Sequence, residues 1–149
     1  VIIPTYCERE NIPRIVDRLA PLLADVDWEV VFVDDDSPDG SLEVLLELAR
    51  QNPRVRFLRR IGRRGLSSAC IEGMCSSSAQ FFAVMDADLQ HDETILPDMV
   101  RALREDPSLD LSVATRYAGA GSVGKWSGAR RLLSKSATVL EKFLLPTSM

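Results

Sequence analysis

The sequence predicts an α/β fold in which a mainly parallel sheet is flanked by helices on both faces. Short apolar runs alternate five times with segments of helical periodicity along the chain. These apolar runs are continuous, which is typical of strands buried on both faces. The 149 residues contain no internal repeat, low-complexity tract or linker. We therefore expect a single domain spanning residues 1–149.

The first two predicted strands lie over residues 1–4, where Pro4 ends the run, and over residues 28–33, which are rich in β-branched side chains. Apolar residues at helical spacing predict a helix over 10–24 between them. We expect Asn11 to cap this helix and Pro21 to kink it or end it early.

The next predicted helix covers residues 41–51, between a Ser-Pro-Asp-Gly turn and an Asn-Pro pair that stops it. A third strand over 55–58 leads through a basic, glycine-flanked loop to a helix over 66–76. Small residues dominate that helix, so its sequence signal is weaker.

The remaining predicted elements are strands over 80–85 and 110–115 and two helices. One helix covers 94–104 after two acidic residues that suit a helix N-terminus. The other runs from 127 to about 145 behind a glycine-rich loop, and its apolar positions favour either packing on the core or lying at a membrane surface.

Composition excludes several classes of protein. The net charge of −4 argues against a nucleic-acid binder, and no apolar run reaches the roughly 20 residues that span a bilayer. Three cysteines without a CxxC pair, beside a single histidine, favour free, buried or half-buried thiols over zinc. The chain starts inside an apolar run without Met, so we expect it to be incomplete at both ends.

Acidic residues follow the predicted strands, at the edge where α/β sheets bind ligands. Asp86 and Asp88 would place two carboxylates on one side of an extended turn, where a hard cation such as Mg²⁺ or Mn²⁺ offsets their repulsion. Gln90 could add an oxygen ligand. The alternative is that these acids only cap the following helix. The Asp34-Asp35-Asp36 run likewise suits either hydrogen bonds to a base or ribose, or an ordinary turn.

Basic residues gather in two places that suit anions, or that form a solvated charged face. One group is Arg59, Arg60, Arg63 and Arg64, and the other is Arg116, Arg130, Arg131 and Lys135. The G-x-G-x-x-G match at 119–124 follows a late strand, so we interpret it as a loop and not as a dinucleotide fingerprint. His91 is interpreted as an exposed loop residue or a group that supports the acidic turn.

Taken together, the motifs resemble family 2 glycosyltransferases of the GT-A fold, and most closely the polyprenol-phosphate (dolichol-phosphate) mannosyltransferases. The matching segments are residues 4–11 (PTYCEREN), 33–40 (VDDDSPDG), 65–69 (GLSSA), 86–91 (DADLQH), Arg116-Tyr117 and Trp126 with 130–135 (RRLLSK). They occur in the family's order and cover nearly the whole chain.

The resemblance implies a set of site residues. The nucleotide would be held by Pro4, Tyr6, Glu8, Val33 and Asp35; the metal and donor diphosphate by Asp86, Ala87, Asp88 and Gln90; and the phosphates by Arg116 and Arg131 with Ser134. Of these, Asp88, Arg116 and Arg131 would be catalytic. The chain departs from the family pattern at Cys7, where Asn is usual, at Asp36, where Gly or Asn is common, and at Thr138.

The implied activity is an inverting, metal-dependent transfer of mannose from GDP-mannose to a polyprenyl phosphate at the cytoplasmic face of a membrane. A membrane-anchoring subunit or a missing C-terminal segment would hold it there. Two alternatives remain open at this point. One is a UDP-sugar-dependent enzyme with a polyprenyl-phosphate acceptor, and the other is a non-catalytic nucleotide-binding or membrane-associated fragment.

Overall fold

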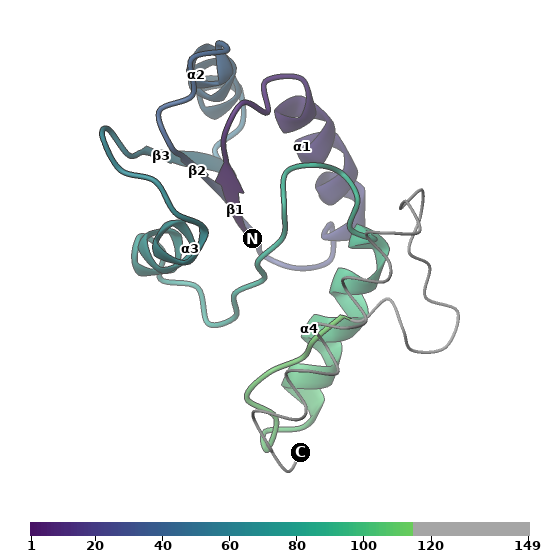
Figure 1. Ribbon diagram of the computed structural model, residues 1–149. Coiled ribbons are helices and arrows are strands. Elements are labelled where there is room, and N and C mark those ends of the chain that lie inside the picture. The colour runs from purple at the N-terminus through teal and green to yellow at the C-terminus, as the bar shows by residue number, and fades with distance from the viewer. Residues whose placement is uncertain (115–149) are drawn as a thin grey trace, which may run out of the picture. The chain divides into compact units, whose positions relative to one another are not determined.

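The computed structural model describes residues 1–114, which contain a three-stranded parallel sheet (Figure 1). Its strands are β1 (Ile2–Thr5), β2 (Val30–Asp34) and β3 (Val55–Arg59), in the order β1-β2-β3. Ile2 lies opposite Val31 across the first pair, and Val30 lies opposite Val55 across the second. The predicted parallel sheet is therefore confirmed.

Helices connect the strands and follow them. They are α1 (Asn11–Leu22), α2 (Ser41–Gln51), α3 (Leu66–Cys75), the short 3₁₀ helix η1 (Glu93–Ile95) and α4 (Leu96–Glu105). Within residues 1–114 no helix is long and apolar enough to cross a bilayer. The predicted last helix and the glycine-rich loop at 119–124 lie outside the described residues.

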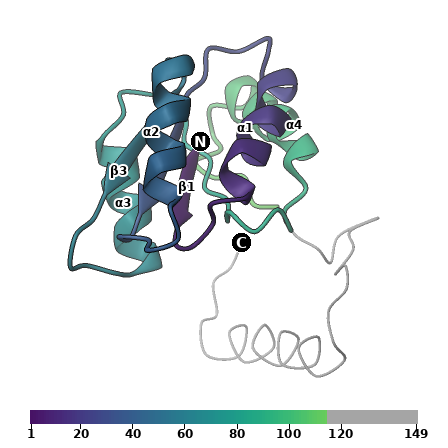
Figure 2. The same cartoon turned by 90° about the horizontal axis from the view of Figure 1, so that it is seen from above.

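Two layers of helix cover the two faces of the sheet (Figure 2). Ile3 and Phe32 belong to the core that α1 and α2 build on one face, while Val31 and Val33 pack with Ala69 of α3 on the other. Alternation of side chains along a strand explains this division, because successive residues point to opposite faces. The expectation of helices on both faces is thus confirmed.

The boundaries of several elements differ from prediction. Pro4 does not end β1, because it lies inside the strand opposite Val33 and has lost only a backbone donor. Asn11 is the first residue of α1 and does not cap it; the capping position is Glu10, which makes no side-chain capping bond. Pro21 lies one residue before the end of α1, in agreement with the early end expected there.

The predicted fourth and fifth strands are corrected. Residues 80–85 make only an isolated parallel bridge, between Val84 and Ile2, with backbone bonds to Ile2 on both sides. Residues 110–114 form no strand, and Thr115 lies outside the described part. Hydrophobicity at 80–85 indicated burial, but a strand also needs a continuous ladder, and Val84 is 44% exposed.

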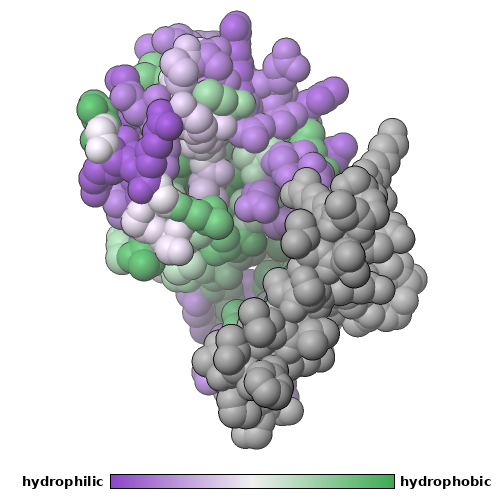
Figure 3. Space-filling model, viewed as in Figure 1, coloured by the Kyte–Doolittle hydropathy of each residue, from purple (hydrophilic) through white to green (hydrophobic). Residues whose placement is uncertain are grey.

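The three cysteines are free, as expected. Cys70 is half-buried, whereas Cys7 and Cys75 are exposed, so the expected burial is wrong for two of the three. Figure 3 shows the face of Figure 1 as mainly hydrophilic in its upper part, with a smaller hydrophobic area beneath.

Candidate functional site

The carboxyl ends of the three strands are joined by backbone and side-chain bonds into one edge. Asp35 N donates to Thr5 O at 3.0 Å, and Arg60 N donates to Asp34 O at 2.8 Å. Cys7 N donates to the Ser37 hydroxyl at 2.9 Å. The bridge from Ile2 to Val84 brings the acidic turn that follows to the other side of β1. Ligands of open α/β sheets bind at this edge.

The three consecutive aspartates have different environments. Asp34 is fully buried and accepts bonds from the Ser37 amide at 2.9 Å and the Ser37 hydroxyl at 2.5 Å. Asp36 is half-exposed and pairs with Arg59 at 2.6 Å. Asp34 therefore shapes the turn, and only Asp35 stands at the centre of a larger network.

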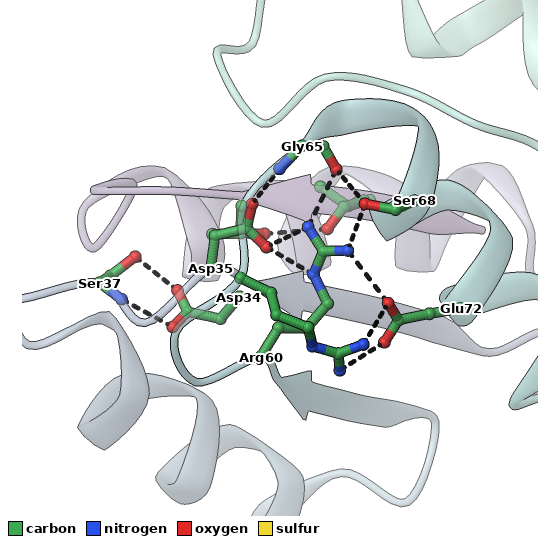
Figure 4. Close-up of polar contacts among 10 residues, drawn as sticks. Asp34, Asp35, Ser37, Arg60, Gly65, Ser68 and Glu72 are labelled. Carbon is green, nitrogen blue, oxygen red and sulfur yellow. Dashed lines mark hydrogen bonds and ion pairs between the residues drawn. The ribbon is translucent and has the colours of Figure 1, made fainter.

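Asp35 is held by a buried arginine (Figure 4). Its Oδ1 accepts a hydrogen bond from Nε of Arg60 at 2.6 Å and forms an ion pair with Nη2 at 2.6 Å, and its Oδ2 accepts a hydrogen bond from Gly65 N at 3.0 Å. Arg60 is 1% exposed and also donates to Ser68 at 2.7 Å and Glu72 at 3.2 Å. Burial would lower the pKa of Arg60, but the bonds and charges of Asp35 and Glu72 raise it. The network thus fixes a charged carboxylate at the strand end.

The first basic group is largely neutralised inside the protein. Arg59 pairs with Asp36, Arg60 with Asp35, and Arg63 with both oxygens of Glu72 at 3.0 Å. These three arginines therefore bind carboxylates of the protein itself, in the positions where external anions were expected. Arg64 differs: its guanidinium lies over the Tyr6 ring, 4.2 Å from the centroid.

The two aspartates of the acidic turn are open to solvent. Asp86 and Asp88 are both exposed, and Ala87 between them is 3% exposed and packed in the core. Asp88 Oδ1 accepts a bond from Gln90 N at 3.0 Å, and Asp86 Oδ2 lies 3.4 Å from Nε2 of His91. His91 Nδ1 also accepts a bond from Asp86 N at 3.4 Å, so the imidazole contacts the acidic turn.

The donor atoms of this turn fit a hard divalent cation, since carboxylate and amide oxygens are its preferred ligands. Within residues 1–114 no three His, Cys, Asp or Glu side chains converge to form a closed metal cage. A cation held by two carboxylates would therefore draw its other ligands from a substrate and water.

Burial raises the pKa of the Cys70 thiol, and the charge of Asp86 raises it further.

The other predicted nucleotide residues fall into two groups. Tyr6 is 41% exposed, and Glu8 lines an open depression of about 390 Å³ with its neighbours Cys7 and Arg9. Val33 and Ala87, by contrast, are buried, so only their backbone atoms face the edge. Glu8 also accepts a bond from the Asn11 amide group at 2.6 Å.

Three non-glycine residues adopt left-handed backbone conformations, one in the segment after each of three strand-like runs. They are Cys7 (φ 58°), Asp36 (φ 59°) and Leu89 (φ 57°). Such conformations are unfavourable for residues with a Cβ and gather at functional sites. Asn and Gly tolerate them best, which explains why the family pattern has these residues at positions 7 and 36.

The second basic group is outside the described residues. Its members are Arg116, Arg130, Arg131 and Lys135, and the expected phosphate-binding Ser134 also lies outside the described residues. Sequence reasoning also missed Ser68, Glu72 and the burial of Arg60. A weak signal was present, because Ser68 and Glu72 are one helical turn apart and would face the same side of α3.

Comparison with known proteins supplies further findings. The family model described as "Glycosyl transferase family 2" matches residues 1–148. A dolichol-phosphate mannosyltransferase of Pyrococcus furiosus is 41% identical over 146 residues, covering 98% of this chain and 41% of that protein. The dolichol-phosphate mannosyltransferase of Saccharomyces cerevisiae is 37% identical, covering 95% of this chain and 54% of that protein.

A polyprenol monophosphomannose synthase of Mycolicibacterium smegmatis is 38% identical over 97% of this chain and 55% of its own. The chain spans about half the length of the curated relatives it matches. A solved structure, the mannosyltransferase PcManGT from Pyrobaculum calidifontis in complex with GDP-Man and Mn²⁺, superposes with a TM-score of 0.57. It is 25% identical, and the match covers 78% of this chain and 35% of that one.

Proposed function

The chain belongs to glycosyl transferase family 2, and from that membership we propose that it is the donor-binding part of an enzyme that transfers mannose from GDP-mannose to a polyprenyl phosphate. The observation that carries the proposal is the acidic edge itself. A fixed Asp35 follows β2, and an exposed Asp86/Asp88 pair follows the run at 80–85 on the other side of β1, in a chain whose relatives are mannosyltransferases.

The fold agrees with this membership. A parallel sheet flanked by helices was expected from the GT-A resemblance, and the solved mannosyltransferase shares this architecture over most of the chain. The match covers about a third of that structure, so the chain contains part of the domain.

On the donor side, we assign the nucleoside to the ends of β1 and β2. Tyr6 offers an exposed ring, Glu8 and Asp35 offer carboxylates, and Pro4 and Val33 lie next to the last residues of β1 and β2. Within residues 1–114, Asp35 Oδ2 accepts one bond, from Gly65, so this oxygen retains capacity for a base or ribose donor.

On the diphosphate side, Asp86, Asp88 and Gln90 would hold Mg²⁺ or Mn²⁺. The backbone of Ala87 would contact the donor diphosphate. When bound, such a cation stabilises the charge that develops on the departing nucleoside diphosphate. The exposed carboxylates and the buried Ala87 between them support this assignment, because both acids then face the donor.

The acceptor side follows from chemistry. A phosphate monoester has a second pKa of about 6, so it is already an anionic nucleophile near neutral pH and needs little help from a general base. Arg116 and Arg131 would bind its charge or that of the donor. Attack on the anomeric carbon opposite the leaving diphosphate inverts the configuration.

The proposed acceptor is a lipid, so we also place the enzyme at a membrane surface, on its cytoplasmic face. A segment or subunit outside this chain would provide the anchor. This placement is tested by asking whether the full-length protein sediments with vesicles that contain polyprenyl phosphate. A protein that stays in the supernatant with and without the lipid would contradict it.

The experiment that tests the donor assignment is calorimetry with GDP-mannose, UDP-glucose and NAD, with and without Mn²⁺. We expect metal-dependent binding of GDP-mannose that Asp88→Ala abolishes. Asp98→Ala is the matched control, since Asp98 is an exposed acid of α4 paired with Arg101 and remote from the turn in sequence. Binding that is unchanged in Asp88→Ala would sink the metal site, and preference for UDP-glucose would change the donor.

A further inference from the structure

Arg64 makes an unusual contact at the proposed nucleotide edge. Its guanidinium carbon lies 4.2 Å from the centroid of the Tyr6 ring, and its Nη2 donates to the Tyr6 hydroxyl at 2.7 Å. The two residues are 58 positions apart, one following β1 and the other preceding α3. The contact therefore closes the gap between the first strand end and the loop after β3.

Arg64 is also the one member of its basic group without a carboxylate partner within residues 1–114. Arg59, Arg60 and Arg63 all form ion pairs at 3.2 Å or less. Cation–π contact orients Arg64 without neutralising it. Its charge and most of its five N–H donors thus remain available at an exposed position.

The surroundings hold Arg64 in place from both sides. The next residue, Gly65, donates its amide to Asp35 and accepts a bond from the buried Arg60 at 2.9 Å. Asp35 and Arg64 are therefore linked through one residue of backbone. The guanidinium of Arg64 lies on Tyr6 after β1, and Asp35 follows the adjacent strand β2, so both belong to the edge to which we assign the base.

Nucleobases differ in what they offer to such a group. Guanine presents two acceptors, O6 and N7, on one edge, and this pair matches the planar fork of an arginine. Uracil presents a single carbonyl oxygen there, next to an N–H that opposes a second donor. An aromatic ring and a guanidinium plane are also the surfaces on which bases stack in proteins.

We propose that Arg64 is a specificity-determining residue that selects a guanine nucleotide over a uracil nucleotide by donating to O6 and N7. This inference rests on the proposed function, because it assigns a role within the same donor site. Tyr6 keeps the fork in position before the nucleotide binds.

The test compares the dissociation constants of GDP, UDP and 7-deaza-GDP, measured by calorimetry with Mn²⁺. The proteins are the unmodified chain, Arg64→Met, Arg64→Lys and the control Arg63→Met, whose arginine pairs with Glu72. We expect Arg64→Met to weaken GDP binding roughly 5- to 150-fold, as for loss of a bidentate pair, with little change for UDP. Arg64→Lys keeps the charge without the fork and should resemble Arg64→Met.

The analogue isolates the contact to N7. The unmodified chain should bind 7-deaza-GDP more weakly than GDP, and Arg64→Met should no longer distinguish the two. Equal weakening of GDP and UDP in Arg64→Met would place Arg64 on the diphosphate and overturn the proposal. Full recovery in Arg64→Lys would overturn it as well, because charge alone would then suffice.

Failure of the inference and failure of the proposed function give different results. If the unmodified chain binds GDP and Arg64→Met binds it equally well, only the role of Arg64 is refuted. If the unmodified chain binds neither GDP nor UDP with Mn²⁺, the donor site itself is refuted, and the role of Arg64 falls with it.

Discussion

At the scale of the residue, a single buried arginine holds the proposed donor edge together. Arg60 connects the end of β2 to α3 through Asp35 and Glu72 while almost fully removed from water. The sequence shows four arginines in one glycine-flanked loop, and nothing in composition or spacing separates Arg60 from the others. Only the packing of α3 over the sheet decides which of them is buried, so this part of the site was not predictable from sequence.

Replacement of Arg60 should therefore be costly. Arg60→Met leaves Asp35 without its main partner, and removal of one member of a buried pair typically costs about 3–5 kcal/mol of unfolding free energy. Urea unfolding measures this change. Arg63→Met is the control: its side chain is 60% exposed, and loss of such a pair should cost about 1 kcal/mol or less. Equal effects of the two variants would contradict the assigned role of Arg60.

Asp39 gives a pH-dependent prediction. Its carboxylate accepts bonds from the Ser41 amide at 3.0 Å, the Ser41 hydroxyl at 2.6 Å and the Arg9 amide at 3.1 Å. Burial would raise the pKa of Asp39, but the Ser41 and Arg9 bonds lower it. A lowered pKa in the folded state means that the stabilisation is present above the ordinary pKa and is lost as the pH falls through the folded value.

We therefore expect Asp39→Asn to reduce the unfolding free energy by about 1 kcal/mol at neutral pH. The difference from the unmodified chain should shrink as the pH falls through the lowered pKa of Asp39. Chemical unfolding as a function of pH measures both values. Asp98→Asn, an exposed control on α4, should change little. A difference that stays constant down to low pH would argue against the ionised carboxylate as the source of stability.

Helices were predicted better than strands at the scale of the element. The bounds of α2 coincide with the predicted 41–51, and α3 ends one residue before the predicted end. Apolar periodicity and stop signals are local properties, so sequence carries them. The strand expected over 28–33 instead begins at Val30 and reaches Asp34, because its ends depend on where neighbouring strands provide partners. The same reason explains the failed strand at 80–85.

Close packing of α3 on the sheet supplies a prediction at this scale. A Cβ on Gly73 would lie 2.5 Å from Cγ2 of Ile2 and 3.0 Å from Cγ2 of Val33. Gly73→Ala gains about 1 kcal/mol of helix propensity but overpacks the interface at a cost of about 1–3 kcal/mol. We expect a net loss of stability in thermal or urea unfolding. Ser67→Ala, at an exposed position of α3, should be neutral or slightly stabilising, and a stabilised Gly73→Ala would show that α3 is free to move away.

At the scale of the whole molecule, the described residues form a sheet of three fully paired strands and one sparsely bonded segment beyond β1. Strand β2 is buried along all five residues between two partners. Beyond β1, the segment around Val84 contributes only bonds to Ile2. Sequence motifs predicted the family correctly, since family membership depends on short segments after strands. They did not predict how strongly each segment is paired.

Hydrogen exchange measures this difference. Amides of Val31–Val33 should exchange most slowly, because global unfolding is needed to expose them. Amides of Phe82 and Val84, which are 39% and 44% exposed, should exchange much faster through local opening. Equal protection of the two segments would indicate a full ladder beside β1 and contradict the isolated bridge.

The strand order has a consequence for synthesis on the ribosome. β2 pairs with β1 and β3 pairs with β2, so the sheet can grow outward as the chain emerges. The segment at Val84 is made after these strands and docks on the opposite edge, at β1. A nascent chain halted once Arg60 has left the exit tunnel should already resist protease across β1 and β2; resistance that appears only after Leu96 has emerged would contradict this order. Translation thus delivers the proposed nucleoside-binding half of the edge before the proposed metal-binding half.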